Sequence, residues 1–194
     1  DAILLLTPPV HPWRLCPLGH YWVKTHDRHI RGKSTSVRGH CRRNPTGKDQ
    51  LYPDEIQEIA KNQFSNLSGG PKADDLGFKN GNDFDSLIRG WTQYWNEIFQ
   101  PDVLLDPDMI KALMASESSF NPKVKNYKLS TRNFVRGIMQ ISDETRMALA
   151  NEKGEIKDHY LTITDKDVLD PNIAITAAVR WLFHKRQLAS SFLK

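Results

Sequence analysis

The chain has 194 residues, of which 39% are hydrophobic and 26% are charged, and its net charge is +4. This composition is that of an ordinary globular protein and excludes a disordered chain or a coiled coil. The sequence has no run of about 18 apolar residues, so it predicts no membrane-spanning helix. Its start, DAILLLTPPV, lacks the basic flank and the cleavage site of a signal peptide, so the export route is left open.

The N-terminal part of the chain is strongly basic. Between Lys24 and Lys48, eight lysines and arginines stand against one acid, Asp27, so this segment carries +7 and the rest of the chain −3. Two stretches rich in β-forming residues flank the turn-like RGKS sequence, which predicts a basic β-hairpin within residues 20–43. Such a patch suits an anionic partner, namely nucleic acid, a membrane surface or an acidic polymer, but it is equally compatible with a solvated edge hairpin.

The two cysteines, Cys16 and Cys41, leave three states open. A disulfide would close a loop of about 25 residues and contribute about 3 kcal/mol by loop entropy. The alternatives are two free thiols or a zinc site completed by nearby histidines. The candidate histidines are His20, His26, His29 and His40. No metal ligand is assigned on this basis, and no cofactor is predicted.

Helices are predicted for most of the remaining chain. The first begins at Pro53, because proline suits the first helical position and Asp54 and Glu55 complement the helix dipole. A long polar connector follows over residues 65–83, and residues 83–99 have the three-to-four spacing of an amphipathic helix.

Three further helices start after a residue that can cap the helix N-terminus. The segments that contain them are 107–118, 141–150 and 171–188, with Asp106, Ser142 and Asp170 as the caps. Residues 151–168 are mixed and polar and are predicted to form a loop with a short irregular piece. We therefore expect an all-helical chain from residue 83 onward. The predicted fold class is mainly α, with a basic N-terminal module at 1–50, a helix and linker at 51–82, and a helical domain at 83–194.

Glu117 is the main candidate for chemistry. It lies on the same helical face as Ile110, Leu113 and Met114, at spacings of seven, four and three residues. Desolvation disfavours an ionised carboxyl group, and so does the partial negative charge of a helix C-terminus. A carboxylic acid that keeps its proton near neutral pH can donate it to a leaving oxygen. The alternative is a structural glutamate that binds the backbone of the following loop.

A second candidate stretch, RGIMQIS, covers residues 136–142. Gly137 permits a close approach of the backbone. Met139 can pack on the face of a pyranose ring, and the amide of Gln140 can bind a hydroxyl or N-acetyl group. Simple packing of Met139, with Gln140 exposed, is the alternative interpretation.

Residues 104–183 resemble the lysozyme-like domain of the soluble lytic transglycosylases of bacteria. Three ordered motifs carry the resemblance: E-S-S-F-N-P at 117–122, G-I-M-Q-I at 137–141 and D-P-N-I at 170–173. The resemblance implies a helical lysozyme-like fold that cleaves the β-1,4 bond between N-acetylmuramic acid and N-acetylglucosamine without a cofactor. It also implies that Glu117 is the general acid and then the general base, and that Ser118, Gly137, Met139 and Gln140 line the sugar subsite.

Three features depart from this family. The loop KVKNYKLSTRNFVR between the first two motifs is several residues longer than usual, so it could reshape the cleft or add a specificity loop. The downstream tyrosine motif of the family, often Y-N-A-G, has no counterpart before Lys194, so a site residue is missing or lies beyond the sequence given. The basic Cys/His segment lies outside the family core and is a candidate contact for a secretion system or a phage tail.

The resemblance places the protein in the periplasm or outside the bacterial cell, with glycan strands of peptidoglycan as its partner. A hydrolytic muramidase on the same fold is the first alternative, and Asp143 and Glu144 are the nearest candidates for its second carboxylate. A non-catalytic module that binds cell wall or nucleic acid through the basic hairpin is the second alternative. That module would bind with a steep salt dependence.

Overall fold

The computed structural model describes residues 11–193, so the start of the chain at residues 1–10, which lacks the features of a signal peptide, lies outside the described residues. The basic segment forms one antiparallel hairpin, in which β1 (His20–Val23) pairs with β4 (His40–Arg43) and β2 (His26–Ile30) pairs with β3 (Lys33–Val37). Its turn is at Arg31 and Gly32, where the φ angles are 48° and 76°. Two consecutive residues with positive φ are typical of a type I′ turn, and they explain the RG sequence there.

Cys16 and Cys41 form a disulfide, with their Cα atoms 5.5 Å apart. Of the three states that the sequence left open, the structure therefore has the first. Among the described residues, no group of histidines, cysteines and acids is arranged to hold a metal ion. The bond fastens the buried Cys16 to β4 of the hairpin.

The five helices begin close to where the sequence predicts them. They are α1 (Pro53–Gln63), α2 (Asp85–Phe99), α3 (Pro107–Ser118), α4 (Asp143–Ala150) and α5 (Pro171–Phe192). The side chains of Asp106, Ser142 and Asp170 accept hydrogen bonds from backbone N–H groups at the starts of α3, α4 and α5, as the sequence predicts. Helix α5 extends four residues beyond its predicted end at residue 188.

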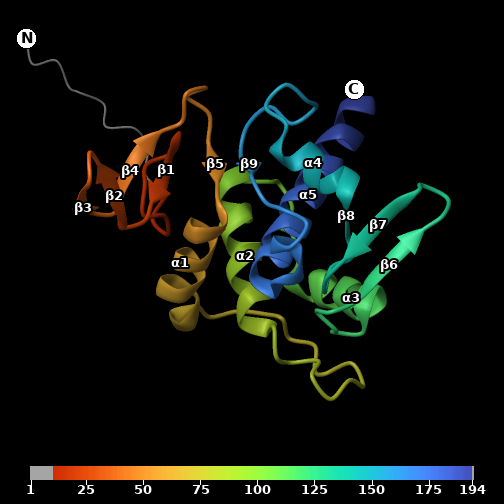
Figure 1. The fold of residues 1–194 in the computed structure, drawn as a ribbon. Helices are drawn as coiled ribbons and strands as arrows, with labels where there is room; N and C mark the ends of the chain where they lie inside the picture. The colour runs from red at the N-terminus through yellow and green to blue at the C-terminus, as the bar shows by residue number, and fades with distance from the viewer. Residues whose placement is uncertain (1–10, 194) are drawn as a thin grey trace, which may run out of the picture.

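The hydrophobic core lies where α2 packs against α5, in the middle of Figure 1. Trp91 and Trp95 of α2 are fully buried, and their indole N–H groups donate to Asn172 and Thr176 of α5 at 2.6 and 3.0 Å. These bonds satisfy polar groups that burial would otherwise leave unpaired. Among the described residues, no helix is long and apolar enough to cross a membrane.

The prediction that the chain is all helical from residue 83 onward is wrong. Strands β6 (Lys125–Lys128), β7 (Asn133–Arg136) and β8 (Ile141–Ser142) form an antiparallel sheet. The sequence predicts a polar loop here because lysines and asparagines interrupt the β-forming residues Tyr127, Phe134 and Val135. Strand pairing overrides this weak local preference. Within 151–168, the structure has the two-residue strand β9 (Tyr160–Leu161) and the short 3₁₀ helix η2 (Asp167–Leu169).

The N-terminal segment is joined to the helical part by strand pairing and by buried polar contacts. Strand β5 (Gln50–Leu51) pairs in parallel with β9, and the 3₁₀ helix η1 (Phe64–Asn66) continues α1 toward the connector. The connector, predicted at residues 65–83, occupies residues 67–84 between η1 and α2. It is bound to α3, because the side chain of Asp108 accepts from the backbone N–H groups of Lys72 and Ala73, each at 2.8 Å. The division into units at residues 50 and 82 stays a prediction.

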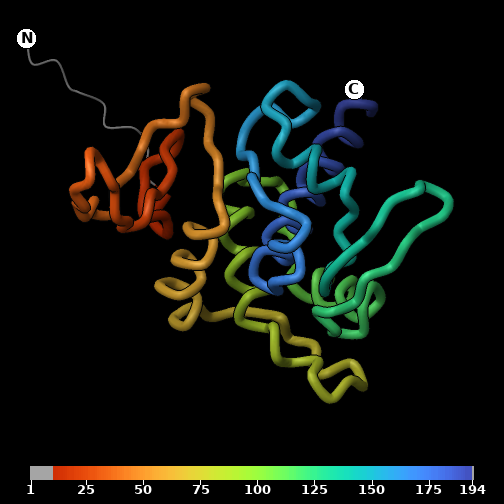
Figure 2. The backbone as a smooth tube through the Cα atoms, viewed as in Figure 1, coloured from red at the N-terminus to blue at the C-terminus, as the bar shows by residue number. Residues whose placement is uncertain are grey.

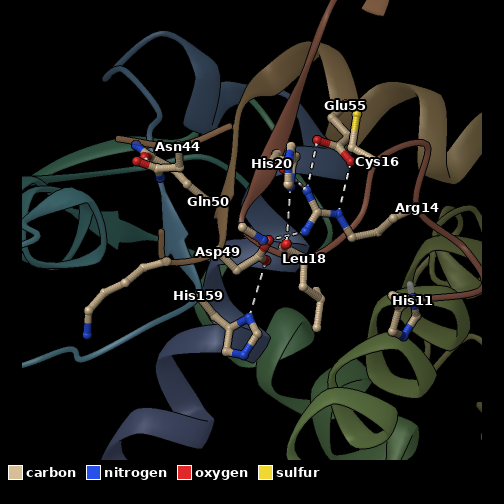
Figure 3. Close-up of polar contacts among 12 residues, drawn as sticks. His11, Arg14, Cys16, Leu18, His20, Asn44, Asp49, Gln50, Glu55 and His159 are labelled. Atoms are coloured by element: carbon tan, nitrogen blue, oxygen red, sulfur yellow. Dashed lines mark hydrogen bonds and ion pairs between the residues drawn. The ribbon is translucent and has the colours of Figure 1, made fainter. Parts of the chain in front are cut away.

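Arg14 is at the centre of these buried contacts, which Figure 3 shows. Its guanidinium donates to both carboxylate oxygens of Glu55 at 2.9 and 3.1 Å, pairs with Asp49, and donates to the backbone carbonyl of His20 at 2.8 Å. His159, which precedes β9, lies 3.2 Å from the other oxygen of Asp49. Burial alone would raise the pKa of Asp49, but the hydrogen bond with His159 and the charge of Arg14 outweigh it and hold that pKa below its usual range.

Candidate active site

A cleft of about 400 Å³ opens beside the C-terminal end of α3. Glu117 lines it, together with Leu113 one turn earlier on the same helix. The opposite sides are formed by the hairpin of β6 and β7, by the start of α4, and by α5. The residues from these three elements, from the turn at residues 137–140 and from β8 are Lys128, Thr131, Asn133, Val135, Met139, Gln140, Ile141, Ser142, Glu144, Thr145, Ala178, Trp181 and Leu182.

The turn after Glu117 is sharp, and the connector supports it. Ser119 and Phe120 both have positive φ angles, 52° and 61°, so the chain reverses as soon as the helix ends. Phe120 is fully buried against Phe78 of the connector, and the side-chain amide of Asn80 donates to the carbonyl of Phe120 at 2.8 Å. These contacts fix where α3 ends and therefore where the carboxyl group of Glu117 lies.

Glu117 is half-buried at the cleft and free of partners. Among the residues that the structure describes, none donates a hydrogen bond to its carboxyl group and none forms an ion pair with it. The structural alternative, in which Glu117 would hold the following loop through its backbone, therefore has no contact in its favour. The carboxyl group is available to a bound molecule.

Ser118 does not line the cleft. Its side chain is buried, and the hydroxyl donates to the backbone carbonyl of Ile138 at 2.7 Å, with the carbonyl of Met114 at 3.3 Å. Because a hydroxyl has one proton to donate, this bond occupies the donor that a sugar would need. Ser118 instead joins the end of α3 to the turn that carries Met139 and Gln140.

Gly137 is required by the packing of the chain itself. Its φ angle is +78°, and an added Cβ atom would lie 2.1 Å from the backbone carbonyl oxygen of Val168 in η2. The close approach that the sequence predicts is therefore made to another segment of the same chain. Gly137 is not among the residues that line the cleft.

Met139 and Gln140 both line the cleft, but the amide of Gln140 already has partners. Its NH₂ group donates to the carbonyls of Val124 and Gly137 at 3.1 and 2.8 Å, and its oxygen accepts from the amide of Asn126 at 2.9 Å. Gln140 thus connects the β6–β7 hairpin to the turn at residues 137–140, the GIMQ turn. Met139 is 4% exposed and lines the cleft with apolar surface, and its contact with a sugar stays a prediction.

The two candidates for a second carboxylate are in different positions. Asp143 pairs with Arg136 of β7 and lies 3.8 Å from Arg146, and it does not line the cleft. Glu144 is exposed and does line it. The geometry therefore separates two residues that are adjacent in the sequence.

The sequence interpretation missed several residues of the cleft. Lys128, Thr131 and Asn133 come from the stretch that it treated as a loop, and strand alternation around Tyr127 and Phe134 is the signal that could have found them. Trp181 and Leu182 of α5 are half-buried and also line the cleft. No local pattern distinguishes a core tryptophan from one that borders a cleft.

A comparison with family models gives a match over residues 99–189 to the family described as Transglycosylase SLT domain. Over this stretch, a little under half of the chain, the protein is similar to the transglycosylase SLT domain family. The match includes all three motifs on which the resemblance is based. No curated protein and no solved structure matches the chain significantly. The SLT family generally comprises lytic transglycosylases, so the match implies an enzyme activity of this type on peptidoglycan and a helical, lysozyme-like domain.

Proposed function

We propose that the chain cleaves the β-1,4 bond between N-acetylmuramic acid and N-acetylglucosamine, with Glu117 as the acid and then the base. The observation that supports this most directly is the carboxyl group of Glu117, which lies at the edge of a cleft of about 400 Å³ and is bound by none of residues 11–193. Leu113, Met139 and Trp181 give that cleft apolar surface against which the face of a pyranose ring can pack.

In the first step, the carboxylic acid of Glu117 donates its proton to the bridging oxygen as the bond between that oxygen and C1 of the muramoyl unit breaks. The N-acetylglucosamine part leaves with a new 4-hydroxyl group. In the second step, the C6 hydroxyl oxygen of the same muramoyl unit bonds to C1, and its proton returns to the carboxylate of Glu117. The product is a 1,6-anhydro ring, and the intramolecular hydroxyl competes with water because it is held close to C1.

A hydrolytic muramidase is the second candidate, because Glu144 gives the cleft a second carboxylate that could orient water. Inverting enzymes need roughly 6.5–9.5 Å between their two carboxyl groups, which leaves room for that water. The two functions differ in their products, since the anhydro product is one water lighter than the reducing-end product.

The experiment is digestion of purified sacculi by the wild type, Glu117→Gln and Glu144→Gln, followed by mass analysis of the released fragments. We expect anhydro fragments from the wild type and from Glu144→Gln, and a loss of about 10²- to 10⁴-fold for Glu117→Gln, because the glutamine can neither donate nor accept the proton. Sacculi left intact by the wild type would contradict the proposal. Reducing-end fragments that disappear in Glu144→Gln would favour the muramidase.

Action on the cell wall is consistent with a location outside the cytoplasm, in a periplasm or beyond. The disulfide between Cys16 and Cys41 supports such a location, because disulfides persist in oxidising compartments. A secretion-system or phage-tail partner for the basic hairpin, and binding of nucleic acid by it, stay predictions that no contact in the structure tests.

A further inference from the structure

The β6–β7 hairpin has two faces of different chemistry. Side chains directly opposite each other in an antiparallel pair share a face, and the faces alternate along each strand. One face carries Asn126, Lys128, Asn133 and Val135, and the other carries Lys125, Tyr127, Phe134 and Arg136. Three residues of the first face line the cleft that contains Glu117, and the fourth, Asn126, binds Gln140. The first face is therefore the inner face of the hairpin and the second is the outer face.

The hairpin brings positive charge to this cleft. Residues 123–136 contain five lysines and arginines and no acid. Among the described residues that line the cleft, Lys128 is the cation, and Glu117 and Glu144 are the acids. Lys128 is exposed, and none of the described residues forms an ion pair with it. Its ammonium group is therefore available to an anionic group of a bound strand.

The inner face is held in a fixed position relative to Glu117. The backbone N–H of Gly137 donates to the carbonyl of Val124 at 2.8 Å, and Gln140 binds both Val124 and Asn126. Ser118, the residue after Glu117, binds the carbonyl of Ile138 in the same turn. These hydrogen bonds hold the strand that carries Lys128 in a fixed position relative to the end of α3, where Glu117 lies.

We propose that Lys128 is a specificity residue that binds a carboxylate carried by the lactyl side chain of the muramoyl unit. This inference rests on the proposed function. The sugar rings are uncharged, whereas the lactyl group ends either in a carboxylate of its own or in a peptide with free carboxylates. An ammonium on a flexible stem suits such a group, because it acts as a compact charge without a fixed geometry. The neighbouring amide of Asn133, which also lines the cleft, adds donors and an acceptor for the same chain.

The test compares peptide-bearing glycan strands, the same strands with their carboxyl groups amidated by methylamine, and strands stripped of peptide. The variants are Lys128→Gln and, as a matched control, Lys125→Gln. Lys125 is on the same strand, but its ammonium lies on the outer face, 4.6 Å from the centre of the Phe134 ring. Both substitutions remove one charge from an exposed side chain, and thermal unfolding of each variant checks that the fold is retained.

We expect Lys128→Gln to raise the KM for native strands about two- to fivefold, as the loss of an exposed ion pair does. Amidation should raise the KM of the wild type by a similar factor and leave that of Lys128→Gln almost unchanged. Lys125→Gln should behave as the wild type on every substrate. Stripped strands carry the lactyl carboxylate itself: if they bind as native strands do, Lys128 accepts either carboxylate, and weaker binding restricts the contact to the peptide carboxylates. An equal KM for the wild type and Lys128→Gln on native strands overturns the proposal.

Strand binding is also measured with Glu117→Gln as the background, so that binding is read without cleavage. A chain that binds native strands through Lys128 but does not cleave them contradicts the proposed function alone. A chain that cleaves strands, and whose binding does not depend on Lys128, contradicts the specificity role alone. Absence of both binding and cleavage contradicts both.

Discussion

Two basic hairpins stand on opposite sides of the helical body, β1–β4 on the left of Figure 2 and β6–β7 on the right. Both are rich in lysine and arginine, yet they are attached in different ways. The first is fastened by the disulfide and by the buried contacts of Arg14, and no cleft residue comes from it. The second is tied to the GIMQ turn and lines the cleft. A basic segment in the sequence therefore indicates an anionic partner. The way in which each hairpin is joined to the helical part decides which of them borders the cleft of Glu117.

The largest expected effect is on the attachment of the first hairpin. Arg14→Met would leave the carboxylates of Asp49 and Glu55 buried without their cation. We expect a loss of about 3–5 kcal/mol in the free energy of unfolding, measured by urea denaturation. Lys24→Met is the control: its ion pair with Asp54, at 3.4 Å, is exposed, and we expect a change below about 1 kcal/mol. Equal losses for both variants would show that the buried contacts do not hold the hairpin.

Lowering the pH is expected to have a smaller effect on the free energy of unfolding, and this effect comes from His11, which precedes the first hairpin in the chain. Burial, aided by the nearby charge of Arg14, lowers the pKa of His11 from 6.5 to about 4. Below pH 6.5 the unfolded chain binds a proton that the folded chain does not, so stability falls as the pH falls toward 4. Between pH 7 and pH 5 the cost is about 2 kcal/mol.

Urea unfolding of the wild type and His11→Gln at both pH values checks this effect. The pH dependence of the variant should be smaller by about 2 kcal/mol. Glu97 acts in the opposite direction, since its carboxylate lies 3.3 Å from His11 and favours the charged ring. A variant with the full pH dependence of the wild type would show that this contact cancels the effect of burial on His11.

A change in stability well below that of Arg14→Met is expected for the second hairpin. Arg136 of β7 pairs with Asp143 at the start of α4, where both side chains keep some exposure to solvent. Arg136→Met should cost about 1 kcal/mol in urea unfolding, well below the cost of Arg14→Met. Because the hairpin borders the cleft, we expect the variant to lose more in cleavage of glycan strands than in stability. An Arg136→Met protein that is fully active but as unstable as Arg14→Met would reverse the comparison.

The sequence predicts the helices well because their signals are local. Asp106, Ser142 and Asp170 cap α3, α4 and α5, and each lies directly before its helix. The position of Glu117 at the end of α3 follows from the same reasoning. The first hairpin is also local, since its turn at Arg31 and Gly32 needs two positive φ angles.

The remaining features depend on tertiary contacts. Arg14 meets Asp49 and Glu55 across 35 and 41 residues of sequence, and no spacing rule indicates such a cluster. Motif spacing places Ser118 and Gln140 near Glu117, but it does not show whether their polar groups face a ligand or the backbone. In the structure both bind the backbone. The second hairpin was not predicted because lysines and asparagines around Tyr127 and Phe134 weaken the local β-strand pattern.

The amide of Gln140 connects Asn126 of the β6–β7 hairpin to Gly137 of the GIMQ turn. One consequence concerns diversification of the chain. Between Lys128 and Asn133 the loop can change in length or sequence without disturbing that junction, because the residues that Gln140 contacts lie outside this stretch. Descendants of this chain could therefore be redirected to other polysaccharides by replacing the tip of one hairpin, while the proton chemistry is inherited intact.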